Sequence, residues 1–149
     1  MIPAAAQIAS IRRILRDSKT IAVVGLSPKP QRPSHQVARY LMAAGYIIIP
    51  VNPGQDTILG LPCYRSLKAI PTQVDMVDIF RRPEAVLPIV EDAIAIGAKF
   101  IWMQEGIVHK GAAAKAEAAG LIVVMDRCTK IDHMNLLRNA INPSCLSAS

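Results

Sequence analysis

The sequence is poor in aromatic residues and has no long apolar run, and each absence argues against a class of partner. Aromatic residues make up 4% of the chain, and Lys and Arg form no dense cluster, so a stacking platform for single-stranded nucleic acid is poorly supplied. The longest uncharged apolar run covers only residues 40–51. A membrane-spanning helix needs about 20 apolar residues. We therefore expect neither a nucleic acid nor a membrane partner.

Cysteine is also scarce, and its spacing predicts no disulfide framework. Cys63, Cys128 and Cys145 form no CxxC pair, which favours reduced thiols and a cytoplasmic location. Acidic residues are outnumbered, because 17 Lys and Arg stand against 11 Asp and Glu and give a formal net charge of +6. With nucleic acid disfavoured, this excess of positive charge predicts a small anionic ligand.

What the 149 residues do contain is a regular alternation of strand-like and helix-like segments. Strands are predicted at residues 20–25, 46–51, 74–80, 99–103 and 121–125. Helices are predicted near residues 4–16, 33–44, 66–70, 83–96, 111–119 and 131–141. Because the strands are continuously apolar, both faces of their sheet must be covered. The pattern predicts one three-layer α/β domain with a doubly wound parallel sheet of five strands. It would occupy residues 20–141, after an N-terminal helix in 1–19 and before a tail in 142–149.

The loop after the first predicted strand is the first candidate site, because ligands of open parallel sheets bind at the carboxyl ends of strands. Gly25 lets a ligand approach the backbone, and Pro33 and Ser34 begin a helix whose amino end attracts anions. Lys29 and Arg32 add positive charge. These residues suit a phosphate or diphosphate, and a Pro-rich turn with solvated cations is the alternative. The loop has one Gly where the dinucleotide fingerprint GxGxxG has three.

Polar residues also follow the next three predicted strands. Asn52 stands where an NAD-binding domain normally has an acidic residue for the ribose hydroxyls, which disfavours NAD, although Asn52 can equally be a turn former. Arg81 and Arg82 lie beside a helix start, where the helix dipole repels cations. That cost favours a role for them in anion binding. Gln104 and Glu105 follow the fourth strand, on the same edge.

Six short stretches occur in a specific order between residues 20 and 133. They are Ile21-Ala-Val-Val-Gly-Leu-Ser-Pro, Arg32-Pro-Ser, Pro50-Val-Asn-Pro, Val77-Asp-Ile-Phe-Arg-Arg-Pro, Trp102-Met-Gln-Glu-Gly-Ile and Met125-Asp-Arg-Cys. In these stretches the sequence resembles the CoA-binding domain family, small stand-alone proteins with the fold of the N-terminal domain of the succinyl-CoA synthetase alpha subunit. The resemblance implies a Rossmann-like fold that binds CoA or an acyl-CoA.

The resemblance also implies contact residues, all of them at strand ends. The CoA diphosphate is expected at the first loop, whose contact residues are Gly25, Leu26, Ser27, Pro28, Lys29, Arg32, Pro33 and Ser34. The adenosine part is expected at the end of the second strand, at Val51, Asn52 and Pro53. The nucleotide would be covered by Phe80, Arg81 and Arg82, and the edge of the site would be formed by Gln104 and Glu105.

No catalytic residue is predicted. The synthetase subunit carries its phosphorylated His on a second domain, and neither His35 nor His133 matches it. A dyad of Cys128 with His133, or a Cys–Asp–His zinc site in the same segment, is a weaker interpretation because no spacing supports it. We expect no bound metal.

The sequence therefore predicts a stand-alone protein that binds CoA or an acyl-CoA without chemistry of its own. Two alternatives stay open. One is an NAD(P)-binding oxidoreductase, which the single Gly of the first loop and the missing acidic residue argue against. The other is the CoA-binding component of a multi-chain acyl-CoA ligase. The latter implies a separate partner chain, and a homo-oligomer is equally compatible with the sequence.

Overall fold

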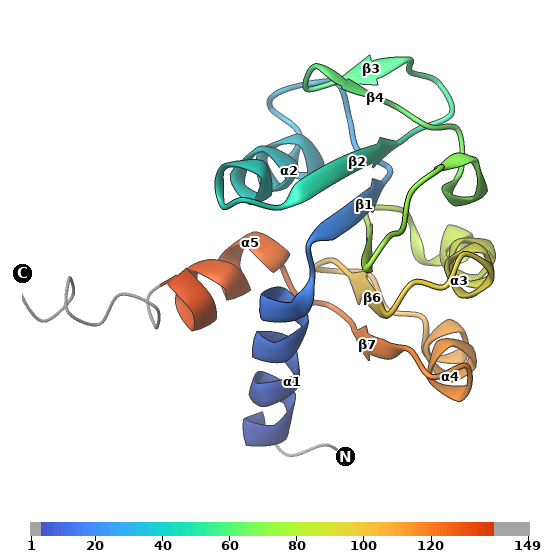
Figure 1. Ribbon diagram of the computed structural model, residues 1–149. Coiled ribbons are helices and arrows are strands. Elements are labelled where there is room, and N and C mark those ends of the chain that lie inside the picture. Colours follow the sequence, from blue (N-terminus) through green and yellow to red (C-terminus); the bar gives the residue numbers. More distant parts are fainter. Residues whose placement is uncertain (1–3, 139–149) are drawn as a thin grey trace, which may run out of the picture.

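Five strands form one parallel sheet in the order β2-β1-β5-β6-β7 (Figure 1). Their bounds are Thr20–Val24 for β1, Ile47–Val51 for β2, Met76–Ile79 for β5, Phe100–Met103 for β6 and Ile122–Val124 for β7. The computed structural model describes residues 4–138. Each predicted strand is present with its ends shifted by at most two residues, and the predicted doubly wound parallel fold is confirmed.

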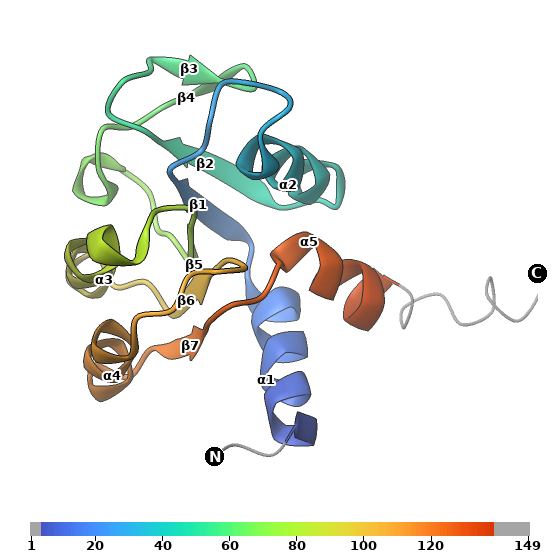
Figure 2. The ribbon, with the colours of Figure 1, turned by 180° about the vertical axis from the view of Figure 1, so that it is seen from behind.

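Helices cover both faces of the sheet (Figures 1 and 2). One face carries α1 (Ala4–Asp17), α2 (Pro33–Ala43) and α5 (Thr129–Asp132), which continues as a π-helical turn, His133–Arg138. The opposite face carries α3 (Val86–Ala95) and α4 (Lys110–Ala118), together with the 3-10 turn Leu67–Ala69. The molecule therefore has three layers with the sheet in the middle.

Alternate strand residues enter two separate cores, which explains why the strands are apolar throughout. In β1, Ala22 and Val24 pack toward α3 and α4, whereas Ile21 and Val23 pack toward α1 and α2. Trp102 of β6 is fully buried on the second side, and its indole Nε1 donates to the carbonyl oxygen of Arg127 at 2.8 Å. Burial on both faces is typical of parallel sheets flanked by helices.

The helices start and stop close to the predicted positions, with differences at two ends. The predicted helix 83–96 begins as a 3-10 turn, Pro83–Ala85, before α3. The C-terminal helix begins at Thr129 instead of residue 131, and its predicted end and the predicted tail 142–149 lie outside the described residues. None of the helices within residues 4–138 is both long and apolar enough to cross a bilayer.

A small hairpin between β2 and β5 was not predicted. It consists of β3 (Thr57–Ile58) and β4 (Leu61–Pro62), paired antiparallel. Its two turn residues, Leu59 and Gly60, both have positive φ, at 56° and 72°, as in the type I′ turns that suit tight hairpins. A leucine gives no signal for that conformation. With strands of two residues, no alternation of apolar and polar residues can be read from the sequence.

Candidate functional site

The strand order creates a switch point between β1 and β5. The chain leaves β1 through α2 and returns in β2 on one side of β1, whereas β5 pairs with β1 on the other side. Ligands of open α/β sheets bind at such a point, outside the carboxyl ends of the strands. The residues that follow the two strands here are Gly25 and Phe80. The predicted phosphate loop and the predicted Arg pair therefore start side by side.

Gly25 and Phe80 are in close backbone contact. Gly25 has a φ of +86°, and a Cβ atom placed on it would stand 2.5 Å from the carbonyl oxygen of Phe80 and 2.9 Å from Cδ of Arg81. The N–H of Gly25 donates to the carbonyl oxygen of Val51 at 2.9 Å, and the N–H of Phe80 donates to that of Val24 at 2.9 Å. Only glycine combines this φ with so close a neighbour.

Polar side chains hold the loop between β1 and α2 in shape. The N–H of Ser27 donates to Oγ of Ser34 at 3.0 Å, and the N–H of Lys29 donates to Oγ of Ser27 at 3.1 Å. Nδ1 of His35 lies 2.9 Å from the carbonyl oxygen of Ser27. Because both serine oxygens act as acceptors in these bonds, each hydroxyl keeps its proton for another acceptor. The loop is thus preorganised and can still donate to an anion.

The loop carries two cations, Lys29 within it and Arg32 at its end. Arg32 is the residue before the helix, with extended backbone and no capping bond from its side chain, and Pro33 is the first helical residue. Within residues 4–138 no carboxylate forms an ion pair with Lys29 or Arg32. A cavity of about 330 Å³, here called the loop cavity, is lined by Gly25, Ser27, Lys29, Arg32, Pro33, Ser34 and Phe80. Its cationic and hydroxyl lining suits a phosphate group.

A second cavity of about 560 Å³ adjoins the first at Pro33 and Phe80 and lies along the ends of β5 and β6. We call it the strand-end cavity; its other lining residues are Val37, Arg81, Arg82, Pro83, Gln104, Glu105, Gly106, Ile107 and Cys128. The structure therefore brings together predicted site residues from three different loops. The two cavities combine a cationic end with a partly apolar end, as an elongated ligand with a phosphate at one end would require.

Five predicted contact residues line neither cavity. Leu26 and Val51 are buried in the two cores, and Pro28 and Pro53 are exposed elsewhere on their loops. Asn52 joins two loops, because its Nδ2 donates to the carbonyl oxygen of Leu26 at 3.0 Å. Its Oδ1 accepts the N–H of Gly54 at 2.9 Å, so Asn52 acts as a turn former.

The sequence matches a family model described as CoA binding domain over residues 19–134. The chain belongs to the CoA-binding domain family. The match covers both cavities and the whole sheet, so the resemblance inferred from six short stretches is confirmed.

Relatives of this CoA-binding domain fall into two groups. Uncharacterized protein YneT of Bacillus subtilis (strain 168) is 43% identical over 125 residues, which cover 84% of this chain and 93% of YneT. A solved structure, a hypothetical protein from Pyrococcus horikoshii OT3, has a TM-score of 0.86 and 41% identity, and covers 92% of this chain and 97% of that one. The other group is longer: acetate–CoA ligase [ADP-forming] II of Archaeoglobus fulgidus is 39% identical over 72 residues, 47% of this chain but 10% of the ligase.

A buried polar network beneath the strand-end cavity of this CoA-binding domain was not predicted. Nε2 of Gln104 donates to Oδ1 of Asp78 at 2.6 Å and lies 2.8 Å from Oγ1 of Thr129, and that hydroxyl donates to Oδ2 of Asp78 at 3.1 Å. The network ties β5, β6 and the start of α5 together. The sequence signal was a single Asp inside the apolar run of β5, which sequence reasoning passed over.

Burial controls the titration of two groups at this edge. Desolvation raises the pKa of Asp78 to about 7, although the hydrogen bonds from Gln104 and Thr129 lower it. Desolvation also raises the pKa of the Cys128 thiol, and the N–H groups of Lys130 and Ile131 oppose that shift. A raised thiol pKa disfavours the thiolate, so Cys128 is not an activated nucleophile in this state.

Cys128 and His133, which the sequence would allow as a catalytic dyad, lie in different cavities. Cys128 lines the strand-end cavity, whereas Nδ1 of His133 lies 2.8 Å from the hydroxyl of Tyr40 and the His133 ring packs edge-on against Tyr40 and Tyr46. Arg127 instead fixes α5, donating to both carboxylate oxygens of Asp132 at 2.7 and 2.9 Å. Across residues 4–138, no group of three or more His, Cys, Asp or Glu side chains is arranged to hold a metal ion.

Proposed function

We propose that this chain binds CoA or an acyl-CoA at the carboxyl edge of its sheet, with the diphosphate in the loop cavity. The observation that carries the proposal is the close approach of Gly25 to the carbonyl oxygen of Phe80. Because Gly25 has no side chain, a ligand can reach the backbone at the switch point. Lys29 and Arg32 supply the charge beside it. Family membership names the ligand class, because the matching family is described as a CoA binding domain.

The remaining parts of the ligand are assigned from the shape of the edge. The adenosine part lies at the end of β2, near Val51, Asn52 and Pro53, and Phe80 to Arg82 cover the nucleotide. The pantetheine arm runs through the strand-end cavity, past Val37 and Ile107 toward Gln104 and Glu105. This placement brings the diphosphate to Lys29 and Arg32, which line the loop cavity.

The proposal favours CoA over NAD(P). The end of β2 carries no acidic side chain for ribose hydroxyls, and the Asn52 amide is already bonded to Leu26 and Gly54. The raised pKa of Cys128 and the separation of Cys128 from His133 support binding without chemistry. Cys63 and Cys128 are both free thiols, in keeping with the cytoplasmic location proposed with this function.

A second candidate function is the CoA-binding component of a multi-chain acyl-CoA ligase. It is favoured by the ADP-forming acetate–CoA ligase of Archaeoglobus fulgidus, a tenth of which the chain matches. In such an assembly the ligand site would be the same and the catalytic groups would come from partner chains. Purification of the tagged chain from its native cell separates the two candidates. A stoichiometric partner supports the ligase component, and a lone monomer or homo-oligomer supports the stand-alone protein.

Ligand titration tests the main proposal. Isothermal calorimetry with CoA, acetyl-CoA, NADH and NADPH compares all candidate ligands on one preparation. We expect CoA or acetyl-CoA to bind at least about tenfold more tightly than either nicotinamide nucleotide, which corresponds to about 1.4 kcal/mol. Tighter binding of NADH or NADPH would overturn the proposal. Mass spectrometry of the ligand retained after purification distinguishes free from acylated CoA.

A further inference from the structure

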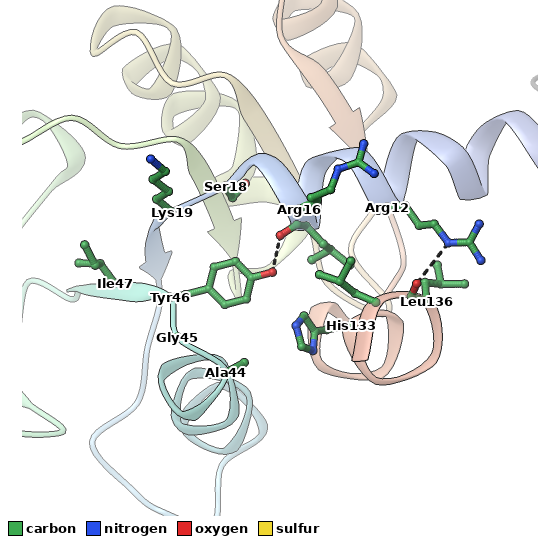
Figure 3. A pocket seen from close by; sticks show the side chains of 12 residues that line it. Arg12, Arg16, Ser18, Lys19, Ala44, Gly45, Tyr46, Ile47, His133 and Leu136 are labelled. Atoms are coloured by element: carbon green, nitrogen blue, oxygen red, sulfur yellow. Dashed lines mark hydrogen bonds between the residues drawn. The ribbon is translucent and has the colours of Figure 1, made fainter. Parts of the chain in front are cut away.

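A third cavity lies at the opposite edge of the sheet, at the amino ends of β1 and β2. Its volume is about 870 Å³, larger than either cavity at the carboxyl edge. The walls come from the end of α1, the segment before β1, the turn between α2 and β2, and the π-helical turn after α5 (Figure 3). We call it the amino-edge cavity. The proposed CoA site does not use it.

Three cations line the amino-edge cavity, and none of its lining residues is acidic. Arg12 and Arg16 project from α1, one helical turn apart, and Lys19 follows them on the same rim (Figure 3). Within the described part of the chain no carboxylate pairs with Lys19 or Arg12, and Nε of Arg16 lies 3.7 Å from an oxygen of Asp17. The cavity therefore has a cationic rim with little local compensation.

The carboxylate of Asp75 is bonded to the backbone next to this rim. Oδ2 of Asp75 accepts the backbone N–H groups of Lys19 and Thr20 at 2.9 and 3.0 Å, and its other oxygen lies 4.0 Å from Nζ of Lys99. Nε of Arg12 donates to the carbonyl oxygen of Leu136 at 3.2 Å. That bond fixes the Arg12 side chain at the rim and leaves its two terminal nitrogens to meet an anion.

Apart from Ser18 and His133, the rest of the wall is largely apolar. Leu15, Leu136 and Leu137 line the cavity together with Tyr46 and Ile47. The hydroxyl of Tyr46 donates to the carbonyl oxygen of Leu15, so the polar end of that side chain is already paired. Ile47 is 61% exposed, more than any other large hydrophobic residue in residues 4–138. Ile47 lies on the other side of Tyr46 from Leu136 (Figure 3), so the cavity offers apolar side chains at both ends, which suits an apolar ligand group.

We propose that the amino-edge cavity binds a small amphiphile with one anionic head group and an apolar tail, such as a medium-chain carboxylate. The head group meets the cationic rim of Arg16 and Lys19, and the tail lies against Ile47, Leu136 and Leu137. Charge alone would select any small anion, and the apolar wall alone would select any alkyl chain. Because both line one cavity, the ligand must carry both features. This site is independent of the proposed CoA site.

Nuclear magnetic resonance titration of the full chain tests the site with decanoate as the probe, below its aggregation concentration. We expect decanoate to shift the amide signals of residues 15–19, 44–47 and 133–137 and to leave residues 25–35 unchanged. Decanol and inorganic phosphate are the comparison probes, each with one of the two features. We expect both to bind more weakly than decanoate, decanol by up to about fivefold, the upper worth of a partly exposed ion pair. Absence of shifts at this cavity, or equal binding of decanol, would overturn the proposal.

Charge variants provide the second measurement. The double variant Arg16→Glu and Lys19→Glu reverses the rim, and we expect it to weaken decanoate binding by at least about tenfold, since repulsion replaces attraction. Arg13→Glu is the matched control: Arg13 lies on the same helix, is similarly exposed and also faces Asp17, but does not line the cavity. Arg13→Glu changes the net charge by half as much as the double variant, so a loss of binding free energy in Arg13→Glu of half that in the double variant, or more, would assign the effect to net charge and overturn the site. Equal CoA affinity of the native chain, the double variant and Arg13→Glu would show that the two sites are separate, so that the failure of one proposal leaves the other standing.

Discussion

The carbonyl oxygen of Phe80 faces Gly25 so closely that a Cβ atom on Gly25 would stand 2.5 Å from it. This contact joins the ends of β1 and β5, the two strands that flank the switch point. A single glycine therefore does two things at once. It adopts a left-handed backbone, and it lets two ligand-facing loops start without a gap between them.

The contact predicts that Gly25→Ala destabilises the fold more than a glycine substitution whose only cost is the backbone conformation. A positive φ costs an L-residue about 1–2 kcal/mol, and forcing a methyl group against packed atoms adds about 1–3 kcal/mol. Urea denaturation measures the sum as a loss of unfolding free energy, and calorimetry should show weaker CoA binding by the folded variant.

Gly120→Ala is the matched control. Gly120 has a φ of +91°, but a Cβ atom there meets nothing within 4 Å, so only the backbone cost of about 1–2 kcal/mol applies. CoA affinity should be unchanged. Equal destabilisation by the two substitutions would mean that the Phe80 contact has no energetic weight.

Much of the fold could be predicted from local signals. Continuous apolar runs marked the five strands, and Pro33 and Gly45 marked the ends of the α2 segment. The order of the strands could not be read in the same way, because it depends on which strands pair in space. The β3–β4 hairpin was missed because Leu59 adopts a positive φ that its side chain does not announce.

The candidate site was predictable by residue type but not by contact. Lys29, Arg32 and Ser34 were recognised because cations and hydroxyls beside a helix start favour phosphate. The pairing of Asn52 with Leu26 joins residues 26 positions apart, and no local pattern encodes it. Asp78 was missed because a charged residue within an apolar strand acquires meaning only when its buried partners are known.

The bond from Asn52 to Leu26 predicts a cost for converting the end of β2 to the acidic residue of NAD-binding domains. Asn52→Asp replaces the amide donor by a carboxylate that would face the carbonyl oxygen of Leu26. We expect a loss of about 1–3 kcal/mol of unfolding free energy, the usual cost of an unsatisfied polar group. Thermal and urea denaturation at neutral pH measure it.

The same substitution also tests ligand choice. Because Asn52→Asp removes the bond between the loops after β1 and β2, it should weaken CoA binding without creating NADH binding. Asn52→Ala removes the bond without adding charge and should lose less stability than Asn52→Asp. A gain of NADH affinity in the Asp variant would indicate that the edge is built for nicotinamide nucleotides.

Asp78 predicts a pH dependence of stability. Its pKa is about 7 in the folded state against 3.8 for the ordinary carboxyl group. Between these values the folded chain holds a proton that the unfolded chain has released, so the unfolding free energy falls as pH rises from about 4 to about 7. Asp78→Asn removes this titration, and denaturation across pH 4–8 should give a flatter profile than the native chain.

Comparison of variants isolates Asp78, because all other ionisable groups are the same in the native chain and in Asp78→Asn. The exposed Asp56→Asn is the matched control and should leave the profile of the native chain unchanged. If Asp78→Asn kept the full fall in stability between pH 4 and 7, the buried network would not hold a proton.

Arg32 predicts the strength and the salt dependence of CoA binding. It lines the loop cavity, and among residues 4–138 it has no carboxylate partner, so a diphosphate there would receive its guanidinium. Arg32→Ala should weaken CoA by about 1.5–3 kcal/mol, the worth of a charge-assisted hydrogen bond, or about ten- to 150-fold in Kd. The fall in affinity with rising salt should also become less steep, since screening acts on one contact fewer.

Arg39→Ala is the matched control. Arg39 is an exposed arginine farther along α2 that lines none of the three cavities, so its removal should change neither the affinity nor its salt dependence. A native salt profile that is flat, or equal losses from Arg32→Ala and Arg39→Ala, would place the phosphates elsewhere.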